Sequence, residues 1–229
     1  MKIVVIGAGA AGLLAAGKAA ETADEVVIIE KNDIIGKKLL ITGKGRCNIT
    51  NSADIEDMIG QYPRNAKFLY SALYTFTNDD IIRIIEENGV NTKVERGGRV
   101  FPVSDKSQDV VKALKKYAFK PNVSLVHDTV KSLIISDGAV KGVKTSKTSI
   151  TADRVIICTG GKSYPRTGST GDGYKFAKQA GHTIIEPKAS LIPVLTEEKF
   201  VKDIMGLSLR NIKITAFNQK NQKVYSDFG

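Results

Sequence analysis

Cysteine, histidine and tryptophan are scarce in this chain of 229 residues. It contains two cysteines, Cys47 and Cys158, two histidines and no tryptophan. Two cysteines cannot build a disulfide scaffold and are typical of a reducing compartment, so we expect a cytoplasmic location. With so few Cys and His residues we expect no structural zinc site. No run of about 18 apolar residues occurs, so we also expect no membrane span.

The composition is otherwise that of an ordinary folded protein. Hydrophobic residues make up 42% and charged residues 25%, which excludes a disordered chain, a collagen and a coiled coil. The 34 basic and 24 acidic residues give a net charge of +10, which favours an anionic partner. The surplus lysines are scattered, however, so we expect no nucleic-acid partner.

Five aromatic residues near Arg64 and Lys67 also bear on whether the protein binds nucleic acid. They are Tyr62, Phe68, Tyr70, Tyr74 and Phe76. They could stack on nucleic-acid bases, but their helical spacing favours packing in a core.

Short apolar runs alternate with helical patterns along most of the chain. Runs at 3–6, 25–30 and 154–158 predict buried parallel strands, and helices are expected near 10–21, 65–74, 78–88, 107–119 and 173–180. Residues 123–126 predict another strand, and 130–152 predict a small antiparallel meander. After Pro187, strands with alternating faces are expected at 191–195, 209–218 and 222–225. We therefore expect an α/β domain at 1–189 and the beginning of a β-rich domain at 190–229.

The strongest motif is a glycine-rich turn between the first strand and the first helix. Its sequence is Gly7-Ala8-Gly9-Ala10-Ala11-Gly12, and a second strand follows the helix. This context is typical of a dinucleotide-binding site, in which a pyrophosphate lies on the helix N-terminus. Glu30 ends the second strand, where a carboxylate can accept hydrogen bonds from ribose hydroxyls.

A long basic loop follows Glu30 and bears on the choice of dinucleotide. Between Lys31 and Arg46 there are five basic residues and one acidic residue, a local charge of +4. Such a loop could wrap the ribityl chain and ring of an extended flavin dinucleotide, and a nicotinamide dehydrogenase has no evident need for it. FAD is therefore favoured. An NAD-binding dehydrogenase and a non-catalytic module that binds a dinucleotide or another anion remain alternatives.

Three segments together resemble a known family. They are GKKLLITGKGRCNITN at 36–51, RGGRVFP at 96–102, and CTGGKSYP with TGSTGDGY between 158 and 174. They resemble the NAD(P)/FAD-dependent flavoproteins related to aminoacetone oxidases and bile-acid-reducing enzymes. The resemblance covers essentially the whole chain. It implies a Rossmann-like FAD-binding domain of the two-dinucleotide-binding type with an antiparallel meander, and an inserted β-domain that begins near residue 190. It also implies that the chain is the N-terminal portion of a longer flavin-dependent oxidoreductase.

The motif and the resemblance together predict which residues contact the cofactor. Gly7, Gly9, Ala10, Ala11 and Gly12 are expected at the pyrophosphate, Glu30 at the ribose, and Lys31, Lys38 and Leu39 beside them. The resemblance places Arg46, Cys47 and Asn48 toward the flavin ring, the backbone of Val130 near the adenine, and Thr159, Gly160 and Gly161 under the cofactor.

The sequence leaves the reaction itself less defined. The expected cofactor is FAD, NAD(P)H is a candidate electron donor, and the substrate is an unidentified small molecule. No pair of titratable residues predicts a catalytic acid or base. Cys47 has no neighbouring cysteine, so we expect it to pack as a small side chain rather than to act in a thiol relay.

Overall fold

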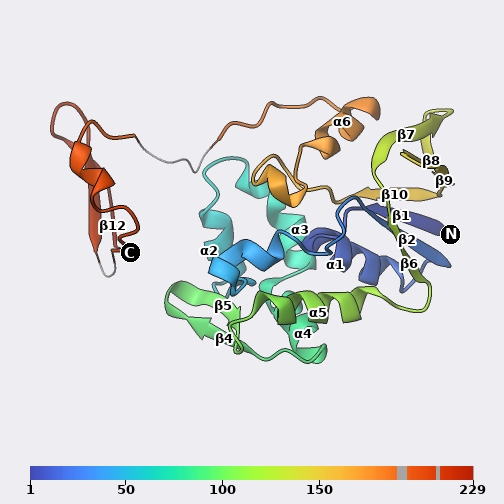
Figure 1. The fold of residues 1–229 in the computed structure, drawn as a ribbon, viewed down its shortest axis with the longest axis horizontal. Helices are drawn as coiled ribbons and strands as arrows, with labels where there is room; N and C mark the ends of the chain where they lie inside the picture. The colour runs from blue at the N-terminus through green and yellow to red at the C-terminus, as the bar shows by residue number, and fades with distance from the viewer. Residues whose placement is uncertain (190–194, 210–211, 229) are drawn as a thin grey trace. The chain divides into compact units, whose positions relative to one another are not determined.

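Four parallel strands form the central sheet of the protein, in the order β10-β1-β2-β6 (Figure 1). The strands are β1 (Lys2–Ile6), β2 (Glu25–Glu30), β6 (Val123–His127) and β10 (Arg154–Ile157). In this computed structural model, residues 1–189, 195–209 and 212–228 are described. The predicted α/β class and parallel sheet are confirmed.

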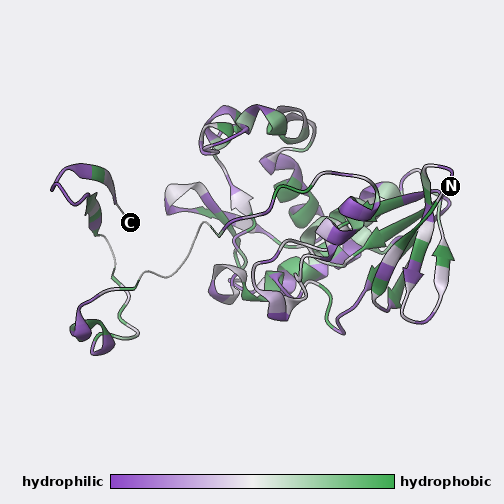
Figure 2. Cartoon of the chain, turned by 90° about the horizontal axis from the view of Figure 1, so that it is seen from above, coloured by the Kyte–Doolittle hydropathy of each residue, from purple (hydrophilic) through white to green (hydrophobic). Residues whose placement is uncertain are grey.

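The strands of the central sheet are coloured mainly as hydrophobic residues in Figure 2. Their residues are apolar in continuous runs because both faces of the sheet are packed against other elements. On one face, Val5 and Ile28 pack against Ala16 of helix α1 (Ala10–Ala19). On the other face, Val4 and Ile29 pack beneath the antiparallel meander and helix α6 (Asp172–Gln179). Because both faces are covered, only the strand ends remain available for a ligand.

The remaining elements of the first part surround this sheet. The meander consists of β7 (Val130–Ser136), β8 (Ala139–Thr145) and β9 (Ser149–Thr151). A second small sheet has the order β3-β5-β4, with β3 (Thr50–Asn51), β4 (Thr92–Glu95) and β5 (Arg99–Pro102). The other helices are α2 (Ile55–Gly60), α3 (Tyr70–Thr75), α4 (Asn78–Glu87) and α5 (Ser107–Ala118), and short 3-10 turns occur at Leu39–Gly45, Ala66–Leu69, Arg96–Gly98 and Pro165–Thr167. A further 3-10 turn, at Lys199–Lys202, lies outside this first part.

The chain separates into two compact units, Met1–Ile184 and Ile185–Gly229. The second unit contains an antiparallel hairpin of β11 (Lys213–Phe217) and β12 (Lys223–Phe228). Of the strand expected at 191–195, residues 191–194 lie outside the described residues. The division at 189/190 stays a prediction. Among the residues described, no helix has the length and apolar character needed to cross a bilayer.

The aromatic residues expected in a core are instead at the surface. Phe68 is 86% exposed, and the four others expected with it are between 42% and 50% exposed. Tyr70 and Tyr74 stack with their ring centroids 5.8 Å apart. Helical spacing places these rings on one side of a short helix, but no described element covers that side enough to bury them.

Candidate functional site

A cavity of about 720 Å³ opens at the carboxyl ends of the parallel strands. Ile6 and Ile157 end β1 and β10, Ile29 is the next-to-last residue of β2, and all three line the cavity. Crevices at this edge are the usual ligand sites of open α/β sheets. Of the predicted cofactor residues, twelve lie on its wall: Gly7, Gly9, Ala10, Ala11, Glu30, Lys31, Lys38, Leu39, Val130, Thr159, Gly160 and Gly161.

Two glycines of the turn are required by the packing of the protein itself. Gly7 has a φ of +103°, and a Cβ there would lie 2.5 Å from the carbonyl oxygen of Cys158. A Cβ on Gly12 would lie 1.8 Å from the carbonyl oxygen of Gly7. Gly12 is buried and does not line the cavity, so its role is to let α1 approach the turn closely.

Gly9 differs from the other two glycines. A Cβ on Gly9 would meet no atom of the described residues within 4 Å, and the Gly9 backbone is extended, with φ −79° and ψ −169°. Gly9 begins α1, and Gly9, Ala10 and Ala11 line the cavity. The space beside Gly9 is therefore open to a ligand, and the positive end of the α1 dipole adjoins it.

Glu30 lies deep in the cavity wall, with 7% of its surface exposed. Its Oε2 accepts a hydrogen bond from the backbone N–H of Ala8 at 2.7 Å. Its Oε1 accepts two, from the backbone N–H of Asn32 at 2.8 Å and from Asn32 Nδ2 at 2.7 Å. A carboxylate has about four acceptor positions. These bonds leave one position on Oε2 for a hydroxyl donor.

Two lysines of the basic loop connect opposite walls of the cavity. Lys31 Nζ contacts Asp172 Oδ2 at 2.7 Å and donates to Thr170 Oγ1 at 2.8 Å. Lys38 Nζ donates to the carbonyl oxygen of Ser163 at 2.9 Å. Burial opposes ionisation of Asp172, but the hydrogen bonds from Lys31 and Thr170 outweigh it and lower the Asp172 pKa. Lys31 and Asp172 thus form an ion pair on the cavity wall, which holds the Lys31 side chain against the start of α6.

The segment after β10 forms the wall facing the basic loop. Gly160 has a φ of +72°, and a Cβ there would lie 2.6 Å from Ser169 Oγ. A Cβ on Gly173 would lie 2.7 Å from Thr159 Oγ1. Small residues are therefore needed where this segment folds back on itself, next to the space a ligand would occupy.

Val130 begins the meander, and Asp128 holds the backbone just before it. Asp128 accepts a hydrogen bond from the backbone N–H of Thr129 at 2.7 Å, and another from the backbone N–H of Lys147 at 3.1 Å. A hydrogen bond from Thr145 and these backbone bonds lower the pKa of Asp128. Asp128, Thr129 and Val130 all line the cavity.

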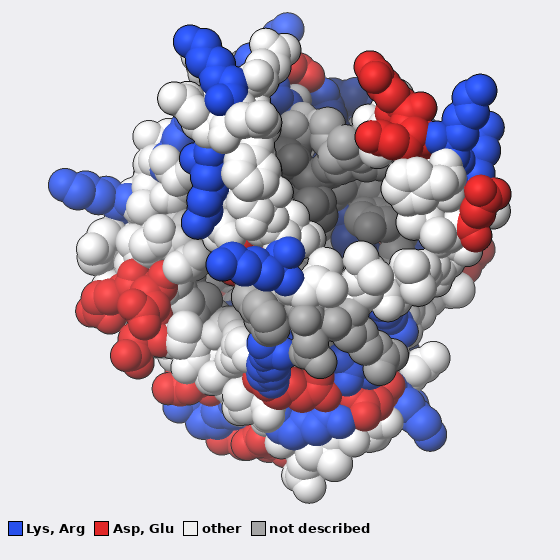
Figure 3. Space-filling view, turned by 90° about the vertical axis from the view of Figure 1, so that its left-hand side faces the viewer, with Lys and Arg blue, Asp and Glu red and all other residues white. Residues whose placement is uncertain are grey.

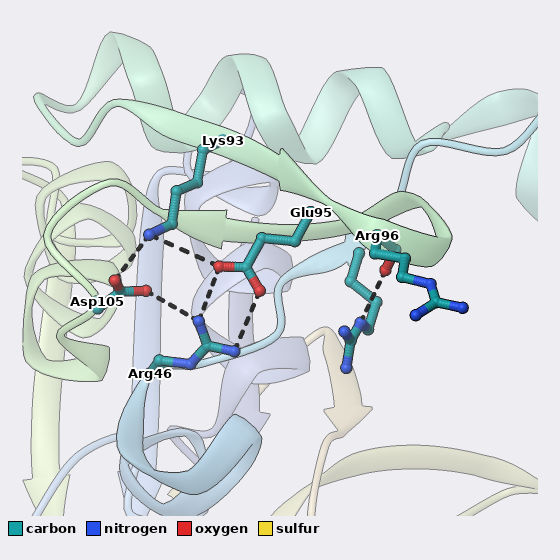
Figure 4. A network of polar contacts seen from close by, with 6 residues as sticks. Arg46, Lys93, Glu95, Arg96 and Asp105 are labelled. Carbon is teal, nitrogen blue, oxygen red and sulfur yellow. Dashed lines mark hydrogen bonds and ion pairs between the residues drawn. The ribbon is translucent and has the colours of Figure 1, made fainter. Parts of the chain in front are cut away.

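Arg46 does not line the cavity but belongs to a network of four charged side chains (Figure 4). Its guanidinium contacts both carboxylate oxygens of Glu95, at 2.8 and 3.2 Å, and Asp105 at 3.2 Å. It also lies 4.0 Å from the ring centroid of Phe101. Lys93 completes the network at 2.7 Å from Asp105. The network ties the end of the basic loop to the small sheet.

Cys47 and Asn48 are also off the cavity wall. Cys47 is 1% exposed, packs in a core with Leu13 and Ile85, and is a free thiol. Burial raises its pKa, and a hydrogen bond with Thr42 only partly offsets this. Asn48 is exposed. The placement of all three residues beside a flavin ring stays a prediction.

Several cavity residues were missed by the sequence reasoning. Asn32, Asp128 and Asp172 are among the polar residues of this group, and Tyr174 and Phe176 are its aromatic ones. Asp172 and Tyr174 belong to the TGDGY segment, which is part of one of the family motifs. That motif is a sequence signal that indicates both residues as candidates for the site. Asn32 and Asp128 carried no such signal. Within the described ranges, no group of three or more His, Cys, Asp or Glu residues could hold a metal ion.

The fold and the cavity define a Rossmann-type dinucleotide-binding protein of the kind found in flavoproteins. The chain belongs to a specific family of this class: its residues 1–225 match the family described as HI0933-like protein Rossmann domain. This confirms the predicted α/β Rossmann fold, and it identifies the family more broadly than the aminoacetone oxidase resemblance did.

Two curated relatives share the same sequence identity with this chain. A protein of Haemophilus influenzae named ribosomal RNA dihydrouridine synthase is 34% identical, over 99% of this chain and 58% of its own length. A protein of Clostridium scindens named 3-dehydro-bile acid delta(4,6)-reductase is 34% identical, over 88% of this chain and 48% of its own length. The chain thus spans about half the length of these relatives.

Solved flavoenzyme structures share the fold. The open conformation of a flavocytochrome c3 fumarate reductase superposes with a TM-score of 0.61 and 21% identity, covering 78% of this chain and 40% of that one. Mycobacterium smegmatis Sdh1 superposes with a TM-score of 0.59 and 22% identity, covering 78% and 38%. At this identity the likeness establishes the fold alone.

Proposed function

We propose that this chain is the FAD-binding part of a flavin-dependent oxidoreductase. The observation that carries the proposal is the combination of an open, side-chain-free helix start at Gly9 with a buried carboxylate at Glu30 in one cavity. A pyrophosphate fits the first feature, and a ribose hydroxyl fits the free acceptor position of the second. An NAD-binding dehydrogenase is not favoured by the family and the flavoprotein neighbours.

The chain's own residues would bind and orient the cofactor, which supplies the hydride or electron transfer when bound. Gly9, Ala10 and Ala11 would hold the pyrophosphate through backbone N–H groups. Glu30 would hold the adenosine ribose, and Lys31 would neutralise charge. These assignments are supported by the position of each residue on the cavity wall.

Other wall residues would complete the site around the two ends of the dinucleotide. Lys38 and Leu39 come from the basic loop, and the backbone of Val130 would face the adenine. Thr159, Gly160 and Gly161 would pass beneath the cofactor. Arg46 would act at a distance, because the network of Glu95 and Asp105 holds the end of the loop that carries Lys38.

The reaction we propose is a reduction, with NAD(P)H as the electron donor. Both relatives that are 34% identical carry names that describe the addition of hydrogen, one to a uridine and one to a bile-acid derivative. A shared cofactor site with different substrates is expected when the flavin carries the chemistry and the surrounding protein selects the substrate. A small unsaturated molecule is accordingly the first candidate substrate.

A base in RNA is the second candidate substrate, and two observations favour it. The relative named ribosomal RNA dihydrouridine synthase aligns with 99% of this chain. The exposed aromatic residues Phe68, Tyr70 and Tyr74 lie near exposed Arg64 and Lys67, a combination suited to base stacking beside phosphates. Against it, the surplus lysines are scattered along the sequence, and acidic side chains stand among the basic ones in the space-filling view of Figure 3. The sequence-based expectation of no nucleic-acid partner thus stays a prediction.

An absorption spectrum of the purified protein tests the proposal directly. We expect a bound flavin spectrum, with FAD identified by mass after denaturation. A colourless protein that binds a nicotinamide dinucleotide but not FAD would overturn it. Binding of RNA whose affinity falls steeply with salt would favour the second candidate substrate over the first.

A further inference from the structure

Asn32 lies where three parts of the cavity wall meet. Its side-chain amide donates to Glu30 Oε1 at 2.7 Å and to the carbonyl oxygen of Thr167 at 3.4 Å. The backbone carbonyl oxygen of Asn32 contacts His127 Nδ1 at 3.1 Å. Asn32 therefore links the end of β2 to the end of β6 and to the segment that follows β10.

The neighbours of this side chain determine which way its amide points. Glu30 Oε1 and the Thr167 carbonyl oxygen are both acceptors, so the NH₂ group must face them. Neither an ionised aspartate nor an alanine can donate either of these bonds. The chemistry of the site therefore calls for an amide at this position.

The backbone of Gly168 lies close to the Asn32 side chain and leaves no space for a side chain of its own on that side. It has a φ of +98°, and a Cβ there would lie 2.5 Å from Asn32 Nδ2. The turn at Thr167 and Gly168 lines the cavity together with Asn32 and Glu30. The absence of a side chain at Gly168 makes room for the amide between two walls.

We propose that Asn32 is the positioning residue for ribose recognition: it occupies both acceptor positions of Glu30 Oε1 and so directs the remaining position on Oε2 to the ligand. Two donors from Asn32 hold Oε1, while the N–H of Ala8 holds one side of Oε2. A carboxylate fixed at both oxygens cannot rotate, so the hydroxyl donor of the ligand meets an acceptor that is already oriented. This inference rests on the proposed function, in which Glu30 binds a ribose.

Binding of ADP and of 2′,3′-dideoxy-ADP to the protein, measured by calorimetry, tests this role. The wild-type protein should prefer ADP, because only ADP offers the ribose hydroxyls. Asn32→Ala should weaken ADP binding by about tenfold, the scale expected for hydrogen bonds to a charged group. It should weaken dideoxy-ADP binding far less, so that the preference shrinks. Asn91→Ala, an exposed residue outside the cavity, is the matched control and should leave both affinities unchanged.

The outcomes separate the inference from the proposed function. A wild-type protein that binds neither ADP nor FAD would overturn the proposed function. A wild-type protein that binds ADP with the ribose preference, together with a folded Asn32→Ala variant that keeps the same preference, would overturn the role of Asn32 alone. Equal losses for ADP and dideoxy-ADP would mean that Asn32 only supports the fold.

Asn32→Asp supplies a second test if the alanine variant does not fold. When protonated, the introduced carboxyl group can donate one bond to Glu30 as the amide does; when ionised, it repels Glu30. ADP affinity of this variant should therefore fall as the pH rises above about 4, the ordinary pKa of an aspartate, relative to the wild type. The wild-type profile accounts for the other charged groups around Asn32, namely Lys31, His127, Asp128 and Asp172. Parallel profiles for the two proteins would contradict the proposal.

Discussion

The backbone N–H of Ala8 donates a hydrogen bond to the carboxylate of Glu30 at 2.7 Å. This bond joins the turn after β1 to the end of β2, and both parts line the same cavity. Glu30 is 7% exposed, and its carboxylate also accepts two bonds from Asn32. The carboxylate therefore stabilises the folded protein in addition to offering an acceptor to a ligand. Mutations at this position should affect both stability and binding.

We expect Glu30→Ala to weaken dinucleotide binding by about 1.5–3 kcal/mol, the range for losing a hydrogen bond to a charged group. The free energy of unfolding should also fall by about 1–3 kcal/mol, because the donors of Ala8 and Asn32 lose their buried acceptor. Calorimetry with FAD and urea unfolding measure the two effects. Glu87→Ala removes an exposed carboxylate and serves as control. Unchanged affinity in a folded Glu30→Ala variant would refute the ribose assignment.

Gly9→Ala and Gly12→Ala should have opposite consequences. Gly9→Ala adds a methyl group to open space beside the cavity, so the protein should keep its stability and bind a dinucleotide less tightly. In Gly12→Ala the new Cβ would lie 1.8 Å from the Gly7 carbonyl oxygen, so α1 must shift, at a cost of about 1–3 kcal/mol or more. Thermal unfolding and FAD titration of both variants make the comparison. A destabilised Gly9→Ala protein would show that the turn, rather than a ligand, requires this glycine.

Cys47 should be neither reactive nor essential for turnover. Burial raises its pKa, so its thiolate fraction, and with it the rate of alkylation, should rise only at higher pH than for a free cysteine. Cys158 has a pKa raised by burial as well but lines the cavity, and should be alkylated first. Iodoacetamide labelling followed by mass analysis at several pH values measures both rates.

Activity provides the complementary test for this cysteine. In a full-length family member, the equivalent of Cys47→Ser should keep most of the flavin reduction rate, because no second sulfur lies beside it to resolve a thiol intermediate. Loss of turnover with flavin binding intact would instead make Cys47 catalytic.

The network around Arg46 should stabilise the protein in a pH-dependent way. A hydrogen bond from Arg46 lowers the pKa of Glu95, and one from Lys93, followed by Arg46, lowers that of Asp105. A carboxyl group whose pKa is lowered on folding stabilises the protein above its unfolded pKa, and this stabilisation is lost as the pH falls through the folded pKa. Arg46→Met should therefore lower the melting temperature at neutral pH.

The loss in Arg46→Met should shrink as the pH falls below the ordinary carboxyl range near about 4 and through the lowered pKa values that Glu95 and Asp105 have in the folded wild type. Thermal unfolding across this range measures the difference between the two proteins. Arg166→Met, at an exposed position, should show little difference at any pH. A deficit that is constant with pH would mean that Arg46 contributes mainly through packing on Phe101.

The sequence alone determined the β1–α1–β2 unit and its glycine turn. Continuous apolar runs predicted buried strands, and glycine spacing predicted a tight turn at the start of a helix, because both depend on residues close together in the chain. The ends of parallel strands share one edge, so the position of Glu30 beside Gly9 could also be foreseen.

Only the tertiary structure decided where the long polar side chains bind. Arg46 pairs with Glu95, 49 positions away, and Asn32 donates to Thr167, 135 positions away. No pattern of residues close together in the sequence predicts either contact. The exposure of Phe68 was likewise not predictable, since helical spacing gives the side of a helix on which a ring lies but not what covers that side. A long polar side chain binds the groups that the folded structure brings within its reach. Those groups belong to segments that are distant in the sequence and become neighbours only through tertiary packing.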